Sequence, residues 1–445
     1  MNAVNTIRTK TRQFAASLND TAATSSPADP WAYISLLGSA LTIGFSLPLA
    51  RGFLVMALVF ICLDFLKTRT RPWIPMVAGL ALAHLLLTVL STVWGINPEH
   101  GIGKLHKLLW FVSLPATAWI IRKPERLGVF LKALILGISI KAAQSLVVIP
   151  LNTLHHLSQF PSFTLALIDQ GSITDAERLM VGVVITAALL MARLVPRRRF
   201  WWGLMAIQCL ALIVQFKRGS WFSAAIVLGL LAIMHLRWRS IILLAGLMIV
   251  ISALPPVHSR LTALRTEWNE STWHPGDTRR LLMWKYIAPP LIKEHPWMGI
   301  GYRSLTPETM KRINRWVEPK RDHLHSNPIQ VLVDTGIIGF VFYLFWMFRA
   351  VYDTVCYQKR VKRNLILDET WMASALLAGL AALLVNGLVE YNFGDGEIVL
   401  MYGFIMGAAA AMGRHASRST ATTDRQSSTS GGRHSGKSDA ATTGR

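Results

Sequence analysis

Two histidines stand where a polar segment changes abruptly into an apolar one. His323 and His325 are separated by one residue in HLHSNPIQVLVDTGIIG, at positions 323–339. An imidazole can bind a metal ion or accept a proton from a hydroxyl group. A metal site needs further ligands, and neither an HExxH motif, a CxxC motif nor a nearby third imidazole accompanies the pair. The sequence therefore favours proton transfer, with no metal and no cofactor.

The residues after His325 are typical of the beginning of a helix. Asn327 is predicted to be the N-cap and Pro328 the first helical residue. The partial positive charge at a helix N-terminus favours bound anions and lowers the pKa of a nearby imidazole. A neutral His325 could thus act as a general base, with His323 as a supporting neighbour. The alternative is an ordinary polar loop that ends at a helix.

Cationic side chains are concentrated in the polar segment 256–327, before and beside these histidines. Guanidinium groups bind phosphate and pyrophosphate through paired hydrogen bonds. The basic residues of this segment outnumber its acidic residues, and they are Arg260, Arg265, Arg279, Arg280, Lys285, Lys293, Arg303, Lys311, Arg312, Arg315, Lys320 and Arg321.

A short amphipathic helix is predicted within this segment. In RRLLMWKYIAPPLI (279–292), Leu281, Trp284, Ala288 and Leu291 recur at a spacing of three to four residues. Arg280 lies one turn before Trp284. It is either a phosphate ligand or an arginine that extends from an interfacial helix towards water.

Long apolar segments must position these groups. The chain has 445 residues, of which 52% are hydrophobic and 16% charged, and its mean hydropathy is +0.39. Apolar runs of about 20 residues are long enough to span a bilayer as helices. We therefore expect an all-α polytopic membrane protein with about twelve transmembrane helices and one large loop of short amphipathic helices. The predicted spans are 31–48, 51–66, 73–95, 105–121, 127–150, 179–196, 199–216, 221–236, 239–255, 328–350, 370–390 and 396–413.

The net charge of +22 agrees with a membrane topology rather than with nucleic-acid binding. Basic clusters alternate with weakly charged turns, which predicts cytoplasmic termini and a 256–327 loop on the outer side of the membrane. The first helix is expected to serve as an uncleaved insertion signal. The predicted organisation is a cytoplasmic disordered N-terminus (1–30), nine helices (31–255), a large outer loop (256–327), three helices (328–413) and a cytoplasmic disordered tail (414–445).

Three motifs together resemble the O-antigen ligase and polymerase (Wzy-type) superfamily of bacterial membrane glycosyltransferases. The first is His325-Ser326, nine residues, Gly336, two residues and Gly339. The second is the Arg-Gly turn at 217–219 after an apolar segment. The third is an arginine followed by Leu-x-x-Trp at 280–284 and then by HPWMGIG at 295–301. The resemblance is strongest over about 200–345.

This resemblance implies a GT-C-like, multi-pass enzyme of the bacterial inner membrane that takes a glycan from undecaprenyl pyrophosphate on the periplasmic side. It implies that 256–327 is a periplasmic catalytic loop. It implies that His325 activates the acceptor hydroxyl and that Arg218 and Arg280 bind the pyrophosphate, in an inverting and metal-independent transfer. Further substrate-binding residues would be Lys217, Arg265, Arg279, Arg303, Arg321 and His323. An outer carboxylate is also implied, and the sequence leaves Glu390, Asp395 and Glu397 as candidates.

Several activities fit these features. The acceptor would be lipid A-core for a ligase, another lipid-linked repeat for a polymerase, and Ser or Thr of a protein for an O-oligosaccharyltransferase. A single large loop without an extended periplasmic part favours the ligase. A non-enzymatic alternative is a transporter or flippase of polyprenyl lipids, which would use charges at the bilayer midplane. Lys141 is the main deep charge, and its role is open.

Overall fold

The computed structural model describes residues 29–69, 73–159, 170–191, 197–235, 280–314, 323–364 and 367–431, together with Gly246 and His258. Every element in these ranges is a helix, which confirms the predicted all-α class. Seven of the helices are long and apolar enough to cross a membrane, as expected of a polytopic protein. They are α3 (Leu47–Thr68), α4 (Met76–Val93), α7 (Pro124–His155), α11 (Arg218–His235), α17 (Asn327–Arg363), α18 (Leu367–Val389) and α19 (Gly396–Gly431).

Shorter helices complete the described part of the chain. The apolar segments also form α2 (Asp29–Thr42), α9 (Ile173–Met191) and α10 (Arg198–Val214). The predicted span 105–121 is not one helix. It is divided into the 3₁₀ helix η1 (Leu108–Val112) and α6 (Ser113–Ile120), which pack against a face of α19 where two glycines allow close approach. Except for Gly246, the span 239–255 lies outside the described residues, so the number of twelve stays a prediction.

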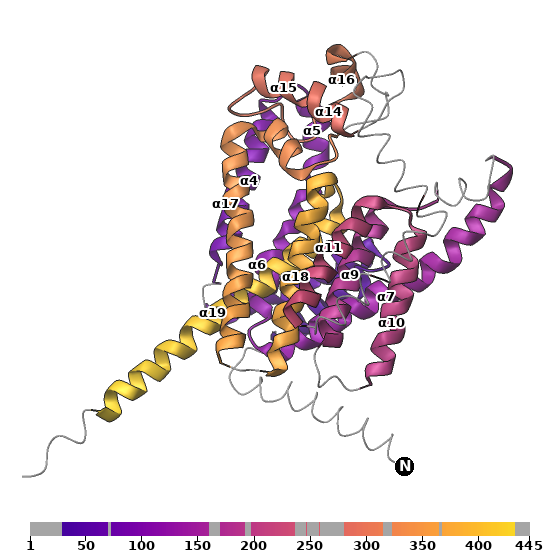
Figure 1. The fold of residues 1–445 in the computed structure, drawn as a ribbon. Coiled ribbons are helices and arrows are strands. Elements are labelled where there is room, and N and C mark those ends of the chain that lie inside the picture. Colours follow the sequence, from indigo (N-terminus) through magenta and orange to yellow (C-terminus); the bar gives the residue numbers. More distant parts are fainter. Residues whose placement is uncertain are drawn as a thin grey trace, which may run out of the picture.

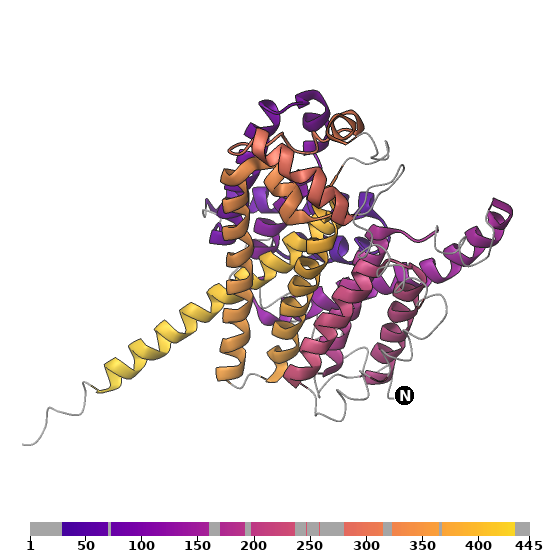
Figure 2. The same cartoon turned by 45° about the horizontal axis from the view of Figure 1, so that its top comes forward.

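The helices form a bundle with an additional layer at one end (Figure 1). This end, called the loop end below, carries α5 (Pro98–Leu105), α14 (Arg280–Tyr286), α15 (Ala288–Glu294) and α16 (Pro307–Ile313). Figure 2 shows α14 and α15 lying across the bundle, where α15 packs against α17. Short helices are thus present in the described part of the predicted loop.

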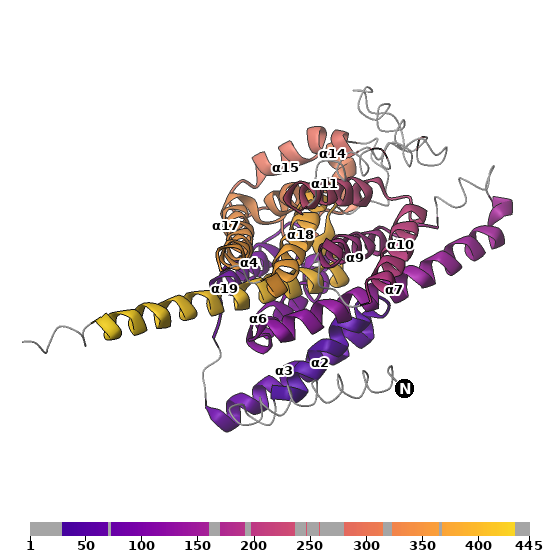
Figure 3. The same ribbon diagram turned by 60° about the horizontal axis from the view of Figure 1, so that its bottom comes forward.

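The α2–α3 hairpin lies along one side of the bundle, next to α6 and α7 (Figure 3). The opposite part is built from α9, α11, α18 and α17, which pack on one another in that order, and α4 covers α17. α19 continues to Gly431, beyond the predicted end of the last span (Figure 1). The predicted disorder of the cytoplasmic tail stays a prediction.

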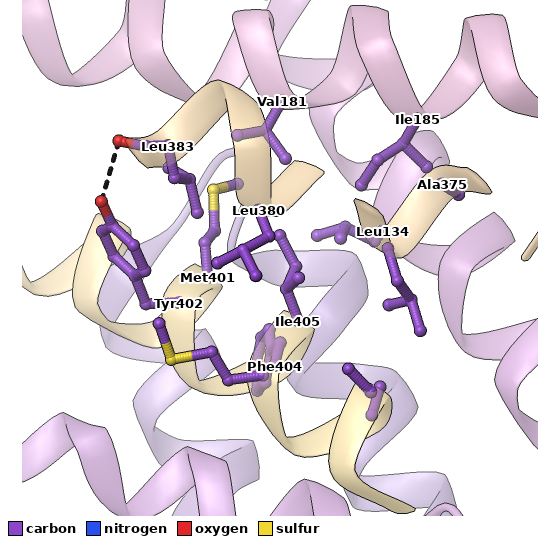
Figure 4. Close-up of a cluster of buried hydrophobic side chains, with 14 of the residues drawn as sticks. Leu134, Val181, Ile185, Ala375, Leu380, Leu383, Met401, Tyr402, Phe404 and Ile405 are labelled. Carbon is purple, nitrogen blue, oxygen red and sulfur yellow. Dashed lines mark hydrogen bonds between the residues drawn. The ribbon is translucent and has the colours of Figure 1, made fainter. Parts of the chain in front are cut away.

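The centre of the bundle is an apolar core between α7, α9, α18 and α19 (Figure 4). Leu134, Ile185, Leu380 and Ile405 are almost fully buried there. The hydroxyl of Tyr402 donates a hydrogen bond of 2.8 Å to the carbonyl oxygen of Leu383, so this polar group is satisfied within the core. The core fixes α18 against α19 and thereby fixes the turn that joins them at the loop end.

Candidate active site

A break in α17 positions the segment that carries the two histidines. Gly336 has a left-handed φ of 63°, and the chain is not helical there. The break separates a short helix at 327–335 from the long apolar helix that follows. A broken helix exposes backbone donors and acceptors, and in a membrane protein other groups must satisfy them.

Residues 295–301, called the glycine turn below, supply these partners. Ile300 and Gly301 donate backbone hydrogen bonds of 2.9 Å to the carbonyl oxygens of Val333 and Asp334. After the break, Ile337 donates one of 2.8 Å to Pro296. A side chain at Gly299 would collide with the backbone of Asp334, and one at Gly336 would collide with that of Trp297. The glycines of two separate motifs therefore form one structural unit that fixes the start of α17.

The beginning of α17 differs from the predicted cap. Ser326 is the N-cap, and Asn327 is already helical. The Asn327 side chain instead donates to Oδ1 of Asn392 at 2.5 Å and accepts from the Asn392 backbone N–H at 3.0 Å. The prediction of an Asn327 cap was wrong because a long-range partner takes up its amide. This pair ties the histidine segment to the turn between α18 and α19.

His325 lies directly before this helix and is buried, with 3% of its surface exposed. Its φ of 52° is in the left-handed region, which is unusual for a residue other than glycine. Its Nδ1 lies 3.2 Å from Oε2 of Glu390. When Glu390 is ionised, Nδ1–H donates this hydrogen bond and Nε2 is the basic nitrogen of the ring.

Arg280 approaches the same carboxylate from α14. It donates hydrogen bonds to Oε1 of Glu390 and to the carbonyl oxygen of Val389. Trp284, one turn later, donates from Nε1 to the carbonyl oxygen of Leu324 at 2.6 Å. The Arg-x-x-x-Trp spacing thus joins one face of α14 to Glu390 and to the residue before His325.

Glu390 is therefore the common partner of His325 and Arg280, two of the three predicted catalytic residues. It is 5% exposed, and a carboxylate at such a site requires charged or hydrogen-bonding partners. Burial lowers the pKa of His325 to about 4, and although the hydrogen bond with Glu390 opposes this shift, His323 and Arg280 add to it. At neutral pH the imidazole is consequently uncharged and able to accept a proton.

The Arg-Gly turn at the start of α11 also reaches this carboxylate. A Cβ at Gly219 would lie 3.6 Å from Cγ of Glu390. Arg218 is the first residue of α11, and Lys217 directly precedes it. Phe216 in this turn has a φ of 52°, so the turn is held in a left-handed conformation like that of His325. Three distant segments therefore meet at Glu390.

The other predicted binding residues are distributed around this centre. The ring centroid of His323 lies 4.3 Å from that of His325 and 5.8 Å from that of Tyr391. Arg303 lies with its guanidinium carbon 5.8 Å from the centroid of the Tyr391 ring. Three remaining predicted ligands, Arg265, Arg279 and Arg321, lie outside the described residues.

The geometry also distinguishes the three candidate carboxylates. Glu390 contacts His325, whereas Asp395 accepts a hydrogen bond of 2.7 Å from the hydroxyl of Thr174. Lys141 forms an ion pair of 2.9 Å with Asp175. Of the three candidates, Glu390 is thus the one that the structure shows in contact with the predicted base. The ion pair with Asp175 gives Lys141 a partner.

One buried carboxyl group has no counterpart in the sequence-based prediction. Glu177 of α9 is fully buried, and neither of its carboxyl oxygens has a hydrogen-bond partner among the described residues. Its position one turn into an apolar helix carries no motif that would have identified it. Within the described ranges, no group of three His, Cys, Asp or Glu side chains is arranged to hold a metal ion, and the metal-independent reaction stays a prediction.

A comparison with protein families matches residues 203–344 to the family described as O-antigen ligase. The match includes Arg218, Arg280 and His325, and the structure brings the segments that carry these residues together at Glu390. Residues 203–344 are therefore similar to the O-antigen ligase family. The match covers less than half of the chain, and no curated protein matches it. The family indicates an O-antigen-processing membrane enzyme of the glycosyltransferase type.

Proposed function

We propose that this protein is an O-antigen ligase. It would transfer O-antigen polysaccharide from undecaprenyl pyrophosphate to a hydroxyl group of lipid A-core, at the periplasmic face of the bacterial inner membrane. The observation that carries this proposal is the contact of Glu390 with both His325 and Arg280. It joins a neutral base to a cationic group suited to pyrophosphate, as glycosyl transfer from a lipid pyrophosphate requires.

The proposed reaction is a single displacement. Nε2 of His325 takes the proton of the acceptor hydroxyl while the oxygen attacks the anomeric carbon. The bond between that carbon and the pyrophosphate oxygen breaks, and the pyrophosphate leaves with the electron pair. Attack opposite the leaving group inverts the anomeric configuration.

The cationic groups stabilise the charge that develops on the leaving group. Arg280 is held by Glu390, and about a third of its side chain is exposed, so its outer face is available to a phosphate. Arg218 precedes Gly219, which packs against the Glu390 side chain. Glu390 orients the His325 ring and stabilises the imidazolium formed during transfer, as the carboxylate of a serine protease triad does.

The test is transfer by the purified protein with each acceptor offered separately. The acceptors are lipid A-core, a second lipid-linked glycan and a Ser/Thr-containing protein, each in EDTA. We expect product with lipid A-core, its loss in His325→Ala, and normal activity in His155→Ala, a control at an exposed histidine at the end of α7. EDTA-sensitive transfer, or full activity of His325→Ala, would refute the mechanism.

The acceptor panel separates the remaining candidates. Product with only the lipid-linked glycan would identify a polymerase, and product with only the protein would identify an O-oligosaccharyltransferase. A protein that forms no product but moves the donor lipid across a membrane, unaffected by His325→Ala, would instead be a transporter.

A further inference from the structure

A second group of cationic and aromatic side chains contacts the other end of the turn that contains Glu390. Nζ of Lys107 donates a hydrogen bond of 2.7 Å to the carbonyl oxygen of Gly394. The Arg51 guanidinium lies against Gly396, where a Cβ would collide with it. Its guanidinium carbon is 4.6 Å from the centroid of the Trp110 ring. We call Arg51, Lys107 and Trp110 the Arg51 cluster; they come from α3, the residues after α5, and η1.

The Arg51 cluster holds donors that the described part of the protein does not satisfy. Nε of Arg51 and Nε1 of Trp110 are buried, and neither has a hydrogen-bond acceptor among the described residues. Glu397 lies close enough to offset part of the Arg51 charge. Arg303 also lies against Gly394, and Asp395 of the same turn accepts its hydrogen bond from Thr174. The cations here therefore outnumber the carboxylates, and the excess of positive charge and of donors favours an anionic ligand rich in acceptor oxygens.

The surface that continues from Arg51 is apolar and exposed. α3 buries the smallest share of its span among the seven candidate membrane helices. Val55, one helical turn after Arg51, and Met56 and Val59 beyond it are exposed. Leu109, beside Trp110, is also exposed. A lipid with its acyl chains along α3 would therefore bring its headgroup to Arg51 and Trp110, residue types that suit a membrane interface.

We propose that the Arg51 cluster binds a phosphate group of the lipid acceptor. This inference rests on the proposed ligase function, in which the acceptor is a lipid. The donor pyrophosphate is assigned to Arg280 and Arg218 beside His325, at the other end of the 390–397 turn. A lipid held at Arg51 by a phosphate, with its sugar extending over this turn, would present its hydroxyl to His325.

The first test is direct binding, which does not depend on catalysis. Full-length protein in neutral detergent is titrated with lipid A-core that carries its phosphates and with the same lipid after removal of the phosphates. We expect the protein to bind the phosphorylated lipid about tenfold more tightly. Arg51→Gln should bind the two lipids equally, whereas Arg122→Gln should behave as the unmodified protein. Arg122 is a matched control because it also lies 4.6 Å from a tryptophan ring, that of Trp119, at the other end of α6.

An ordinary phospholipid would offer the same phosphate chemistry, and competition separates the two sources. Phosphatidylglycerol in tenfold excess should displace little of the phosphorylated lipid A-core. Equal competition at equal phosphate concentration would overturn the assignment to the acceptor. Equal affinity of the unmodified protein for both forms of lipid A-core would overturn the phosphate site itself.

The second test is steady-state transfer. Arg51→Gln should raise the KM for the phosphorylated acceptor about tenfold and leave kcat and the KM for the donor unchanged, and Arg51→Lys should recover most of the loss. A raised donor KM would assign the cluster to the pyrophosphate, and an equal loss of kcat with both acceptors would indicate a structural role; either overturns the proposal. Phosphate-dependent binding without any glycan transfer would refute the proposed ligase function but would still support a phosphate site at the Arg51 cluster.

Discussion

Replacing Glu390 by glutamine isolates the charge that we assign to orienting and stabilising the base. Glutamine has nearly the same size and keeps an acceptor oxygen for His325, but it carries no charge. Arg280 is about one-third exposed, so water can solvate it once its carboxylate partner is gone. We therefore expect Glu390→Gln to fold normally and to lose activity.

The expected loss follows from the contact between Glu390 and His325. When the imidazole takes the proton, it becomes a cation whose Nδ1 lies 3.2 Å from the carboxylate. Two unit charges at this distance interact by about 5 kcal/mol at an effective dielectric constant of about 20. Arg280 already pairs with the same carboxylate, and a charged hydrogen bond typically contributes about 1.5–3 kcal/mol. A loss of about 3 kcal/mol in the transition state lowers kcat roughly a hundredfold.

The assay is kcat for glycan transfer at saturating donor and acceptor, with the unfolding temperature measured on the same preparations. Asp395→Asn is the matched control, because this carboxylate lies in the same turn but accepts its hydrogen bond from Thr174. It should retain kcat within about threefold, since it lacks the contact with His325 that supplies the effect. Equal losses in both variants, or a Glu390→Gln enzyme within threefold of the original, would show that the charge at 390 does not assist the base.

Three further predictions concern the base and its supports. Burial lowers the pKa of His325 to about 4, and only the neutral ring accepts a proton. The measured kcat/KM should therefore stay constant down to about pH 5 and fall tenfold per pH unit below about pH 4. A fall centred near pH 6.5 would contradict this prediction. Gly336→Ala places a side chain at a φ of 63° and against the glycine turn, so the unfolding temperature and the activity should both fall. Gly103→Ala is the control: an added Cβ would meet no atom within 4 Å, so neither quantity should fall. Trp284→Phe removes the hydrogen bond to Leu324 and should cost about 1 kcal/mol of stability and lower kcat, while a donor KM that alone changed would speak against a positioning role.

The helices long and apolar enough to span a membrane were predictable because the length and hydrophobicity of each segment are enough to identify it. A run of apolar residues long enough for a bilayer must form hydrogen bonds within its own backbone, so α4, α7, α11 and α18 lie close to the predicted spans. The predicted span 328–350 differs, because α17 is broken at Gly336 and continues to Arg363. The 105–121 segment shows the limit of this rule. Its apolar composition resembles that of a span, but close packing on the glycine face of α19 divides it into two short helices. That contact joins residues far apart in the chain and has no local signature.

Part of the site was predictable for a similar reason. His325, Arg280 and Arg218 each lie in a motif, and the structure brings their segments together at Glu390. The sequence did not distinguish Glu390 from Asp395 and Glu397 as the functional carboxylate. All three lie in one polar segment and differ only in the partners that the fold gives them. The Asn327 cap failed on the same ground, since a good local cap residue can be claimed by a distant amide.

The broken helix explains why motifs that are apart in the sequence belong to one site. The nine residues between Ser326 and Gly336 in the motif form the short helix, and Gly336 marks its end. The glycine turn must then supply hydrogen-bond partners for the backbone at the break, because unsatisfied backbone groups are costly away from water. It does so with glycines, since a side chain at Gly299 would strike the partner backbone. The glycine turn follows α14 and α15 in the chain. Its packing against α17 therefore also helps to place Arg280 of α14 beside Glu390. A side chain introduced at Gly299 or Gly336 would displace the glycine turn from the break in α17. Such a substitution should therefore both weaken the fold and separate Arg280 from His325.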